Sequence, residues 1–243
     1  MKPTPLPKQK NLRADCAWVI YQILEHGKSS REILDKVQRR HPPKDNAWIQ
    51  EMSLGVMRKL PILQTWLRTL LDRPLKGNKK IIEHLILLGL YQLAFSRVSK
   101  HAAVGETVSA ASYLGAPALK GLVNAVLRNF QRDDIAAKPI DDEIIASGLP
   151  KWLYKSIAAA YGDNTEQVID ATNGMAPIWL RVNTQQTSKT AFMTKLDEAN
   201  IGYTLSEAHN DAIILDGRSD ITSLPGFEEG HFAVQDGAAQ LAA

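Results

Sequence analysis

The 243-residue sequence predicts an α-helical bundle followed by a small α+β domain. Apolar residues recur at helical spacing through the first 132 residues, whereas the period-two alternation typical of strands first appears near residue 178. The basic and acidic residues are also distributed unequally between these two parts. Residues 1–132 contain 22 Lys and Arg against 9 Asp and Glu, and the remainder contains 7 against 17. The first half is therefore strongly basic and the second acidic, which indicates two domains with different tasks.

The first two helices are delimited by their caps. Residues 12–24 carry one apolar stripe, and Gly27 stands where that helix ends. Ser29 or Ser30 caps a second, short helix, which ends before the His-Pro-Pro at 41–43 because the residue before a proline disfavours the helical conformation.

Five further helices complete the predicted bundle. A third begins near Asp45, and Pro61 separates it from a fourth because proline is tolerated only in the first turn of a helix. The fifth, 81–95, is apolar on nearly all sides, so we expect it at the centre of the bundle. The last two are expected at 102–114 and 118–132.

The second domain mixes helices and strands. A helix is predicted from residue 151, and Asp163 caps the next one. Residues 177–184 alternate apolar and polar side chains, which predicts a strand. Ser188 begins another helix, 212–215 and 232–235 are two more candidate strands, and a final helix begins after them. This order is typical of a small α+β domain.

The domain bounds follow from these elements. We expect a mobile basic leader at 1–10, the helical domain at 11–134, a linker at 135–148, and the α+β domain at 149–234. Residues 235–243 begin a helix that has hardly started when the sequence stops, so we expect the chain to be the front portion of a longer protein.

Composition excludes several classes of protein. Hydrophobic residues make up 44% and charged residues 23%, which argues against general disorder. The single cysteine, Cys16, cannot pair within the chain, and the first ten residues do not resemble a signal peptide. The longest apolar stretch, 81–95, falls short of the roughly 20 residues needed to cross a bilayer. A cytoplasmic protein with no membrane partner is expected.

A net charge of +13 over residues 1–132 favours a polyanionic partner, because a strong positive field attracts phosphate. A basic but merely solvated helical surface is the alternative. The candidate phosphate contacts lie in the leader, at helix ends, and on the polar stripe of the last helix. They are Lys8, Lys10, Arg13, Lys79, Lys80, Arg97, Lys100, His101, Lys120 and Arg128.

Several kinds of chemistry lack support. The six histidines are scattered without ligand spacing, so no metal site is expected. No glycine-rich loop joins a strand to a helix, so nucleotide binding of that type is not indicated. Cys16 lies on the apolar stripe of the first helix, which favours an inert core thiol over a nucleophile.

Four sequence segments resemble a known family. HAAVGETV at 101–108 and KGLVNAVLRNF at 120–130 resemble the two signatures of the NusB domain. PIWLRVNT at 177–184 and LPGFEEGHFAVQDGAAQ at 224–240 resemble the pre-catalytic region of bacterial RNA 5-methylcytosine methyltransferases. In this order they resemble the ribosomal RNA small subunit methyltransferase B family (RsmB, also called Sun or Fmu).

The resemblance implies transfer of a methyl group from S-adenosylmethionine to carbon five of a cytosine in small-subunit ribosomal RNA, with two cysteines as the catalytic pair. The Rossmann-like domain that carries those cysteines and the cofactor loop is expected to lie beyond this sequence. Cys16 matches neither cysteine. No catalytic residue is therefore expected within the chain, which by itself should bind no cofactor and should be inactive.

The resemblance also assigns four residues. Gln235 and Asp236 fall near the family's cofactor site, with a strand end and a helix cap as the alternative reading. Arg181 and Asn183 correspond to the family's RVN triplet and are expected either to contact RNA or to hold their strand to its neighbour. We expect a monomer that binds small-subunit ribosomal RNA. A NusB-type regulator of transcription and a protein-interaction bundle stay open as alternatives.

Overall fold

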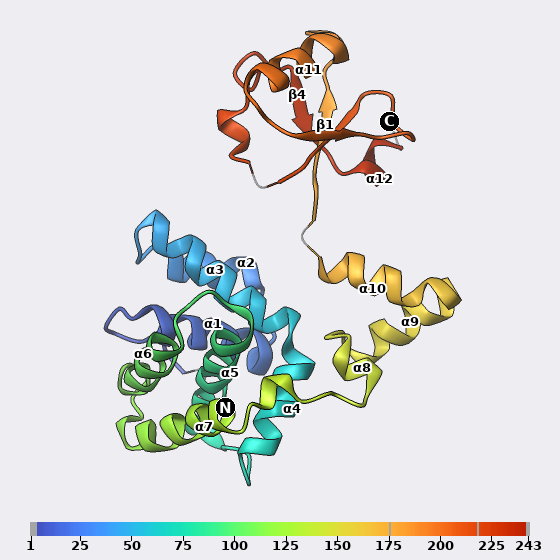
Figure 1. The fold of residues 1–243 in the computed structure, drawn as a ribbon. Helices are drawn as coiled ribbons and strands as arrows, with labels where there is room; N and C mark the ends of the chain where they lie inside the picture. Colours follow the sequence, from blue (N-terminus) through green and yellow to red (C-terminus); the bar gives the residue numbers. More distant parts are fainter. Residues whose placement is uncertain (1–3, 175, 218, 242–243) are drawn as a thin grey trace. The chain divides into compact units, whose positions relative to one another are not determined.

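A computed structural model describes residues 4–174, 176–217 and 219–241 (Figure 1). The chain divides into two compact units, Met1–Ile169 and Asp170–Ala243, here called the first and second units. The first is helical, and the second is built on one four-stranded antiparallel sheet. The predicted fold class is confirmed.

The first unit begins with seven α-helices that match the predicted bundle. With their short 3-10 turns they are α1 (Leu12–His26), α2 (Ser30–Gln38), α3 (Pro43–Arg58), α4 (Leu60–Leu70), η1 (Gly77–Lys79), α5 (Lys80–Phe95), α6 (Lys100–Tyr113), η2 (Pro117–Leu119) and α7 (Lys120–Arg132).

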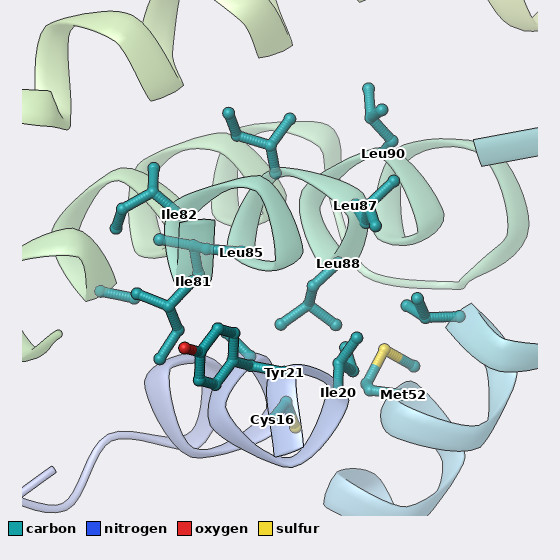
Figure 2. Close-up of a cluster of buried hydrophobic side chains, with 14 of the residues drawn as sticks. Cys16, Ile20, Tyr21, Met52, Ile81, Ile82, Leu85, Leu87, Leu88 and Leu90 are labelled. Atoms are coloured by element: carbon teal, nitrogen blue, oxygen red, sulfur yellow. The ribbon is translucent and has the colours of Figure 1, made fainter. Parts of the chain in front are cut away.

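Helix α5 lies at the centre of the bundle, as its sequence predicts. It contacts α1, α3, α4, α6 and α7 (Figure 1). Figure 2 shows Leu88 of α5 pointing toward Ile20 of α1 and Met52 of α3. All three side chains are buried, and burying a side chain of this size contributes about 1.5–3 kcal/mol. Among the described residues, no helix is both long and apolar enough to span a bilayer.

Local signals fix the helix ends. Asn11 caps α1, its side-chain oxygen accepting a hydrogen bond from the Ala14 amide at 2.9 Å. Gly27 ends the same helix in the left-handed conformation, with φ of 61°. Pro61 lies in the first turn of α4, as predicted. Helix α3 begins at Pro43, slightly before the predicted start, because proline is favoured in the first turn of a helix.

The segment that follows α7 differs from its prediction as a linker. It contains η3 (Ile135–Ala137) and α8 (Glu143–Ala146), and α8 packs on α4. Ile135 and Ile140 pack against the bundle core. These isoleucines give the acidic segment an apolar side, which composition alone did not reveal.

Two helices connect this segment to the sheet. They are α9 (Lys151–Tyr161) and α10 (Thr165–Asn173), separated by η4 (Gly162–Asn164). The division between the compact units falls at Ile169, within α10, whereas the sequence places the start of the second domain at residue 149. By their contacts, α9 and the first part of α10 group with the helical unit.

The second unit holds a sheet of strand order β2-β3-β1-β4. Its elements are β1 (Ile178–Val182), α11 (Lys189–Glu198), β2 (Tyr203–Leu205), β3 (Ala212–Leu215), η5 (Ile221–Ser223), β4 (Phe232–Val234) and α12 (Gly237–Gln240). Leu180 of β1 pairs with Ile213 of β3 and with Val234 of β4. Phe192 and Leu196 of α11 pack in one apolar cluster with Leu180 and Ile213.

Candidate nucleic-acid interface

Residues 4–10 of the leader contact the bundle, and the mobility expected of the leader stays a prediction. The Trp18 indole N–H donates to the carbonyl oxygen of Thr4 at 2.8 Å, and the Gln22 amide donates to the same oxygen at 3.1 Å. Pro7 is buried and Leu6 packs on the core. The buried indole and amide of α1 need acceptors, and the leader backbone supplies one.

A polar pocket of about 400 Å³ lies where the leader meets α6 and α7. Gln9 of the leader, Ser109, Ser112 and Tyr113 of α6, and Lys120 of α7 line it. The pocket therefore combines one cation, two hydroxyls and an aromatic ring. These are groups that bind phosphate and stack on bases.

Two of the predicted cations are neighbours of Gln9 in the sequence. Lys8 and Lys10 are exposed on either side of it. The structure places Gln9 and Lys120 at one pocket, although they lie more than 100 residues apart in the sequence. Their positions in the sequence do not predict that they lie close together.

The pocket also contains residues that the sequence reasoning missed. Ser109, Ser112 and Tyr113 have helical i, i+3 and i+4 spacing, which places them on one face of α6. That spacing was available in the sequence. A pattern of charged residues does not reveal it, because none of the three is charged.

Helix α7 has one buried apolar face and one exposed polar face. Val123, Val126, Leu127 and Phe130 are buried, whereas Arg128 is exposed. The two-faced helix is confirmed. Arg128 is free to meet a phosphate, and Lys120, half-buried, meets the pocket at the first turn of the same helix.

Arg13 is engaged within the bundle, and its contact with phosphate stays a prediction. Its Nε donates to Gln92 Oε1 of α5 at 2.9 Å, and its guanidinium lies over the Trp48 ring of α3 at 5.3 Å. Burial lowers its pKa. A guanidinium engaged in this way holds α1 to two neighbouring helices, because its Nε donates to α5 and its planar face lies over a ring of α3.

Lys80 is also engaged within the bundle. Its Nζ lies 3.1 Å from Glu25 Oε2 of α1, and the side chain is only partly exposed. Lys79 beside it is exposed. The two neighbouring lysines therefore differ: Lys79 faces solvent, and Lys80 pairs across α1 and α5.

The other predicted cations do not form one cluster with Lys79. Arg97, Lys100 and His101 are exposed around the start of α6. Lys79 and Arg97 flank opposite ends of the 16-residue α5, which is about 24 Å long at a rise of 1.5 Å per residue. The exposed cations are therefore spread over the bundle. Of the predicted cations, Lys120 lines the pocket at the leader, and Lys80 lines another between α1, α4 and α5.

A second polar pocket, of about 300 Å³, lies in the second unit. Arg181 of the inner strand β1, Asn183 just after that strand and Gln235 just after β4 line it, together with Gln185 and Asp211. Arg181 Nη1 donates to Gln235 Oε1 at 3.4 Å. The structure thus brings together residues that the sequence assigned separately to RNA and to the cofactor region.

Asn183 has a local structural role in this pocket. Its Nδ2 donates to the Gly230 carbonyl oxygen at 3.0 Å, and its Oδ1 accepts from the Gln185 amide at 3.2 Å. The side chain therefore ties the end of β1 to the turn before β4. Arg181 lies within 4 Å of no carboxylate in the described part of the chain, which leaves its charge available to a ligand.

Gln235 and Asp236 are engaged within the chain. Asp236 caps α12, its carboxylate accepting from the Ala238 amide at 2.9 Å. Gln235 contacts Arg181 and, through Nε2, the Ala239 carbonyl oxygen at 3.4 Å. These local contacts do not make a cofactor pocket, so we derive no cofactor step from them. A contact of either residue with S-adenosylmethionine stays a prediction.

Cys16 is a core thiol. Its side chain is buried, and desolvation raises its pKa to about 12. A thiol with that pKa is protonated near neutral pH and is a poor nucleophile. Among the described residues, no group of three His, Cys, Asp or Glu side chains could hold a metal ion.

Family models match two parts of the chain. Residues 10–132 match the NusB family, and residues 149–222 match the ferredoxin-like domain of RsmF/B-like methyltransferases. The chain belongs to the NusB family. Its NusB domain covers α1 to α7, and the second match takes in α9 and α10 together with most of the sheet. The predicted resemblance is confirmed in both parts.

Curated relatives agree with this assignment. The chain is 42% identical over 234 residues to the ribosomal RNA small subunit methyltransferase B of Vibrio cholerae, with 96% of this chain and 54% of the relative aligned. The namesake of Escherichia coli is 39% identical over 241 residues, with 97% and 55% aligned. The chain spans about half the length of the curated relatives it matches.

A solved structure shares the fold. The crystal structure of PH0851 matches 95% of this chain and 54% of its own chain with a TM-score of 0.57. The sequence identity is 16%, so the likeness extends to the fold alone.

Proposed function

We propose that this chain is the RNA-targeting N-terminal portion of an S-adenosylmethionine-dependent methyltransferase that modifies carbon five of a cytosine in small-subunit ribosomal RNA. The observation that carries the proposal is the identity of 39–43% to ribosomal RNA small subunit methyltransferase B over about 95–97% of the chain. A cytoplasmic location is part of the proposal, because bacterial ribosomal RNA is made and modified there.

The NusB domain supplies phosphate contacts in this account. Lys120 lines a cavity that also holds two serine hydroxyls, and the exposed Lys8 and Lys10 are the sequence neighbours of Gln9, which lines the same cavity. Cations and hydroxyls position an RNA backbone, and the Tyr113 ring at the same pocket offers a face on which an unpaired base stacks. The domain thereby reads the shape and phosphates of an RNA stem-loop.

The second unit supplies a smaller polar contact. Arg181 forms no ion pair within 4 Å in the described part of the chain, and it lies in the pocket that Asn183, Asp211 and Gln235 also line. A guanidinium in such a place pairs with a phosphate or a base edge. We assign this pocket to RNA near the target nucleotide, with Asn183 holding the pocket wall.

The chemistry itself is assigned to sequence outside these 243 residues. S-adenosylmethionine supplies the methyl group when it is bound. The one cysteine of the chain is a buried, protonated thiol and cannot add to the cytosine ring. The chain orients RNA, and we expect it to transfer no methyl group by itself.

A chimera tests this assignment. The segment of the Vibrio cholerae relative that aligns with this chain is replaced by the chain, and transfer of labelled methyl groups to small-subunit ribosomal RNA is measured. We expect the chimera to methylate this RNA and the isolated chain to transfer nothing. An unrelated RNA of equal length is the matched substrate control.

Two results contradict the proposal. One is a folded chimera, checked by circular dichroism, that methylates neither RNA. The other is a chimera that methylates both RNAs equally, because targeting would then not reside in this chain. Preferential binding of a single-stranded leader RNA would instead favour a NusB-type regulator.

A further inference from the structure

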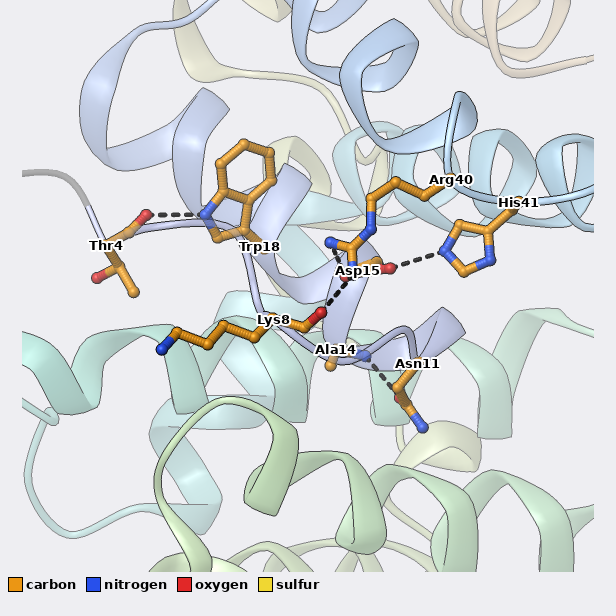
Figure 3. A network of polar contacts seen from close by, with 8 residues as sticks. All are labelled: Thr4, Lys8, Asn11, Ala14, Asp15, Trp18, Arg40 and His41. Carbon is orange, nitrogen blue, oxygen red and sulfur yellow. Dashed lines mark hydrogen bonds and ion pairs between the residues drawn. The ribbon is translucent and has the colours of Figure 1, made fainter.

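A buried carboxylate lies behind the docked leader (Figure 3). Asp15 of α1 is fully buried, with 0% of its surface exposed. His41 Nε2 lies 2.7 Å from Asp15 Oδ2, and Arg40 Nη1 lies 3.4 Å from Asp15 Oδ1. A carboxylate removed from water is costly unless it is paired, so Asp15 holds both partners at the end of α2.

Arg40 reaches from this carboxylate to the leader. Its Nη2 donates to the carbonyl oxygen of Lys8 at 3.5 Å, and its side chain is mostly buried. One guanidinium therefore bridges a buried carboxylate and the leader backbone. Figure 3 shows the Lys8 carbonyl oxygen joined to Arg40, with the Lys8 ammonium pointing away from that contact.

The contact between Arg40 and Lys8 also fixes the position of the next residue, Gln9. Gln9 is one wall of the pocket that Lys120 and Tyr113 line. The leader is fixed on the other side of Lys8 by the Thr4 carbonyl, which accepts hydrogen bonds from Trp18 and Gln22. Docking of the leader thus completes the pocket and directs the ammonium of Lys8 outward.

We infer that Arg40, held in place by Asp15, is a positioning residue that docks the leader and thereby completes the RNA-binding pocket of the NusB domain. The inference rests on the proposed function for its RNA part and on geometry alone for its docking part. Arg40 acts through the leader and not by touching RNA.

The first test is the variant Arg40→Gln, which removes the bridging charge. Trypsin cleaves after Lys8 and Lys10 only when the leader leaves the bundle, so the rate of these two cuts reports docking. We expect cleavage to be about tenfold faster in Arg40→Gln, because a hydrogen bond to a charged group is lost. Arg39→Gln is the matched control, since Arg39 is a neighbouring, exposed arginine.

Trp18→Phe is a second, independent variant. It removes the indole donor to Thr4 and keeps an aromatic ring in the core. We expect it to raise leader cleavage as well. Thermal unfolding shows whether each variant folds. If Arg40→Gln does not fold, Trp18→Phe still tests whether the leader is docked. Leader cleavage as slow as wild type in a folded Arg40→Gln or Trp18→Phe variant overturns the inference.

Measurements of RNA binding distinguish a role of Arg40 in docking the leader from direct contact of Arg40 with RNA. With a transcript of small-subunit ribosomal RNA, we expect Arg40→Gln to bind about fivefold more weakly and with a lower salt slope than Arg39→Gln. In a background that carries Lys8→Ala, Gln9→Ala and Lys10→Ala, Arg40→Gln should add no further loss, because it acts through those three leader residues. An additive loss overturns the inference, since Arg40 would then contact RNA itself.

The experiments can reject the proposed function and the docking role of Arg40 independently of each other. If the wild-type chain binds no RNA while Arg40→Gln still exposes the leader to trypsin, the proposed function fails and the docking role of Arg40 stands. If RNA binds and the leader stays protected in the folded variants, the docking role fails and the proposed function stands.

Discussion

Joint replacement of Lys8, Lys10, Lys120 and Arg128 by alanine is expected to weaken binding of small-subunit ribosomal RNA about 100-fold at 0.1 M salt. Lys120 lines the pocket between the leader, α6 and α7, Lys8 and Lys10 are the exposed neighbours of its lining residue Gln9, and Arg128 is exposed on α7. Each phosphate contact releases counterions, so the loss of four contacts should lower the slope of log K against log salt by about 3. Filter binding across a salt series measures both quantities.

A matched variant distinguishes the loss of specific phosphate contacts from the loss of overall positive charge. Lys28, Arg31, Lys44 and Arg73 are exposed cations of the same unit that do not line this pocket. Their joint replacement removes the same net charge, and we expect less than about a fivefold loss with a nearly unchanged slope. Equal losses in the two variants would show that RNA binding depends on the overall field, and the assigned contacts would then be wrong.

The substitution Leu88→Ala is expected to cost the first unit about 2–5 kcal/mol of its free energy of unfolding. Leu88 lies on the central helix α5, fully buried against α1 and α3 (Figure 2). The change leaves a cavity that rigid neighbouring helices cannot close. Urea unfolding, followed by helical circular dichroism, gives the difference between variant and wild type.

The control for this prediction is Val234→Ala. Val234 is 57% exposed on the edge strand β4, so its loss should change stability by less than about 0.5 kcal/mol. A cost below about 1 kcal/mol for Leu88→Ala would contradict the central position of α5, because a side chain at the middle of a bundle cannot be removed so cheaply.

The bundle could be predicted from sequence because its signals are local. An apolar stripe, a cap and a proline each depend on a few neighbouring residues, as Asn11, Gly27 and Pro61 show. The strand β2, Tyr203–Leu205, was missed. It is three residues long and mostly exposed, so it is held by pairing with β3 and carries no apolar pattern of its own.

The candidate site was predicted less completely. Exposed cations such as Lys8 and Arg128 could be found from charge, but charge does not reveal which cations the fold engages. Arg13 is committed to Gln92 and to an aromatic ring, and Lys80 is committed to Glu25. These partners lie far apart in the sequence, so only the packing of the helices brings them together.

The most direct test of the account is a titration of the 243-residue chain, at two salt concentrations, against small-subunit ribosomal RNA and an unrelated RNA of equal length. We predict tighter and salt-sensitive binding of the ribosomal RNA, because the pockets of the two units recognise its shape as well as its phosphates. Equal binding of both RNAs, or binding of neither, would contradict the claim that this chain targets the enzyme to its substrate.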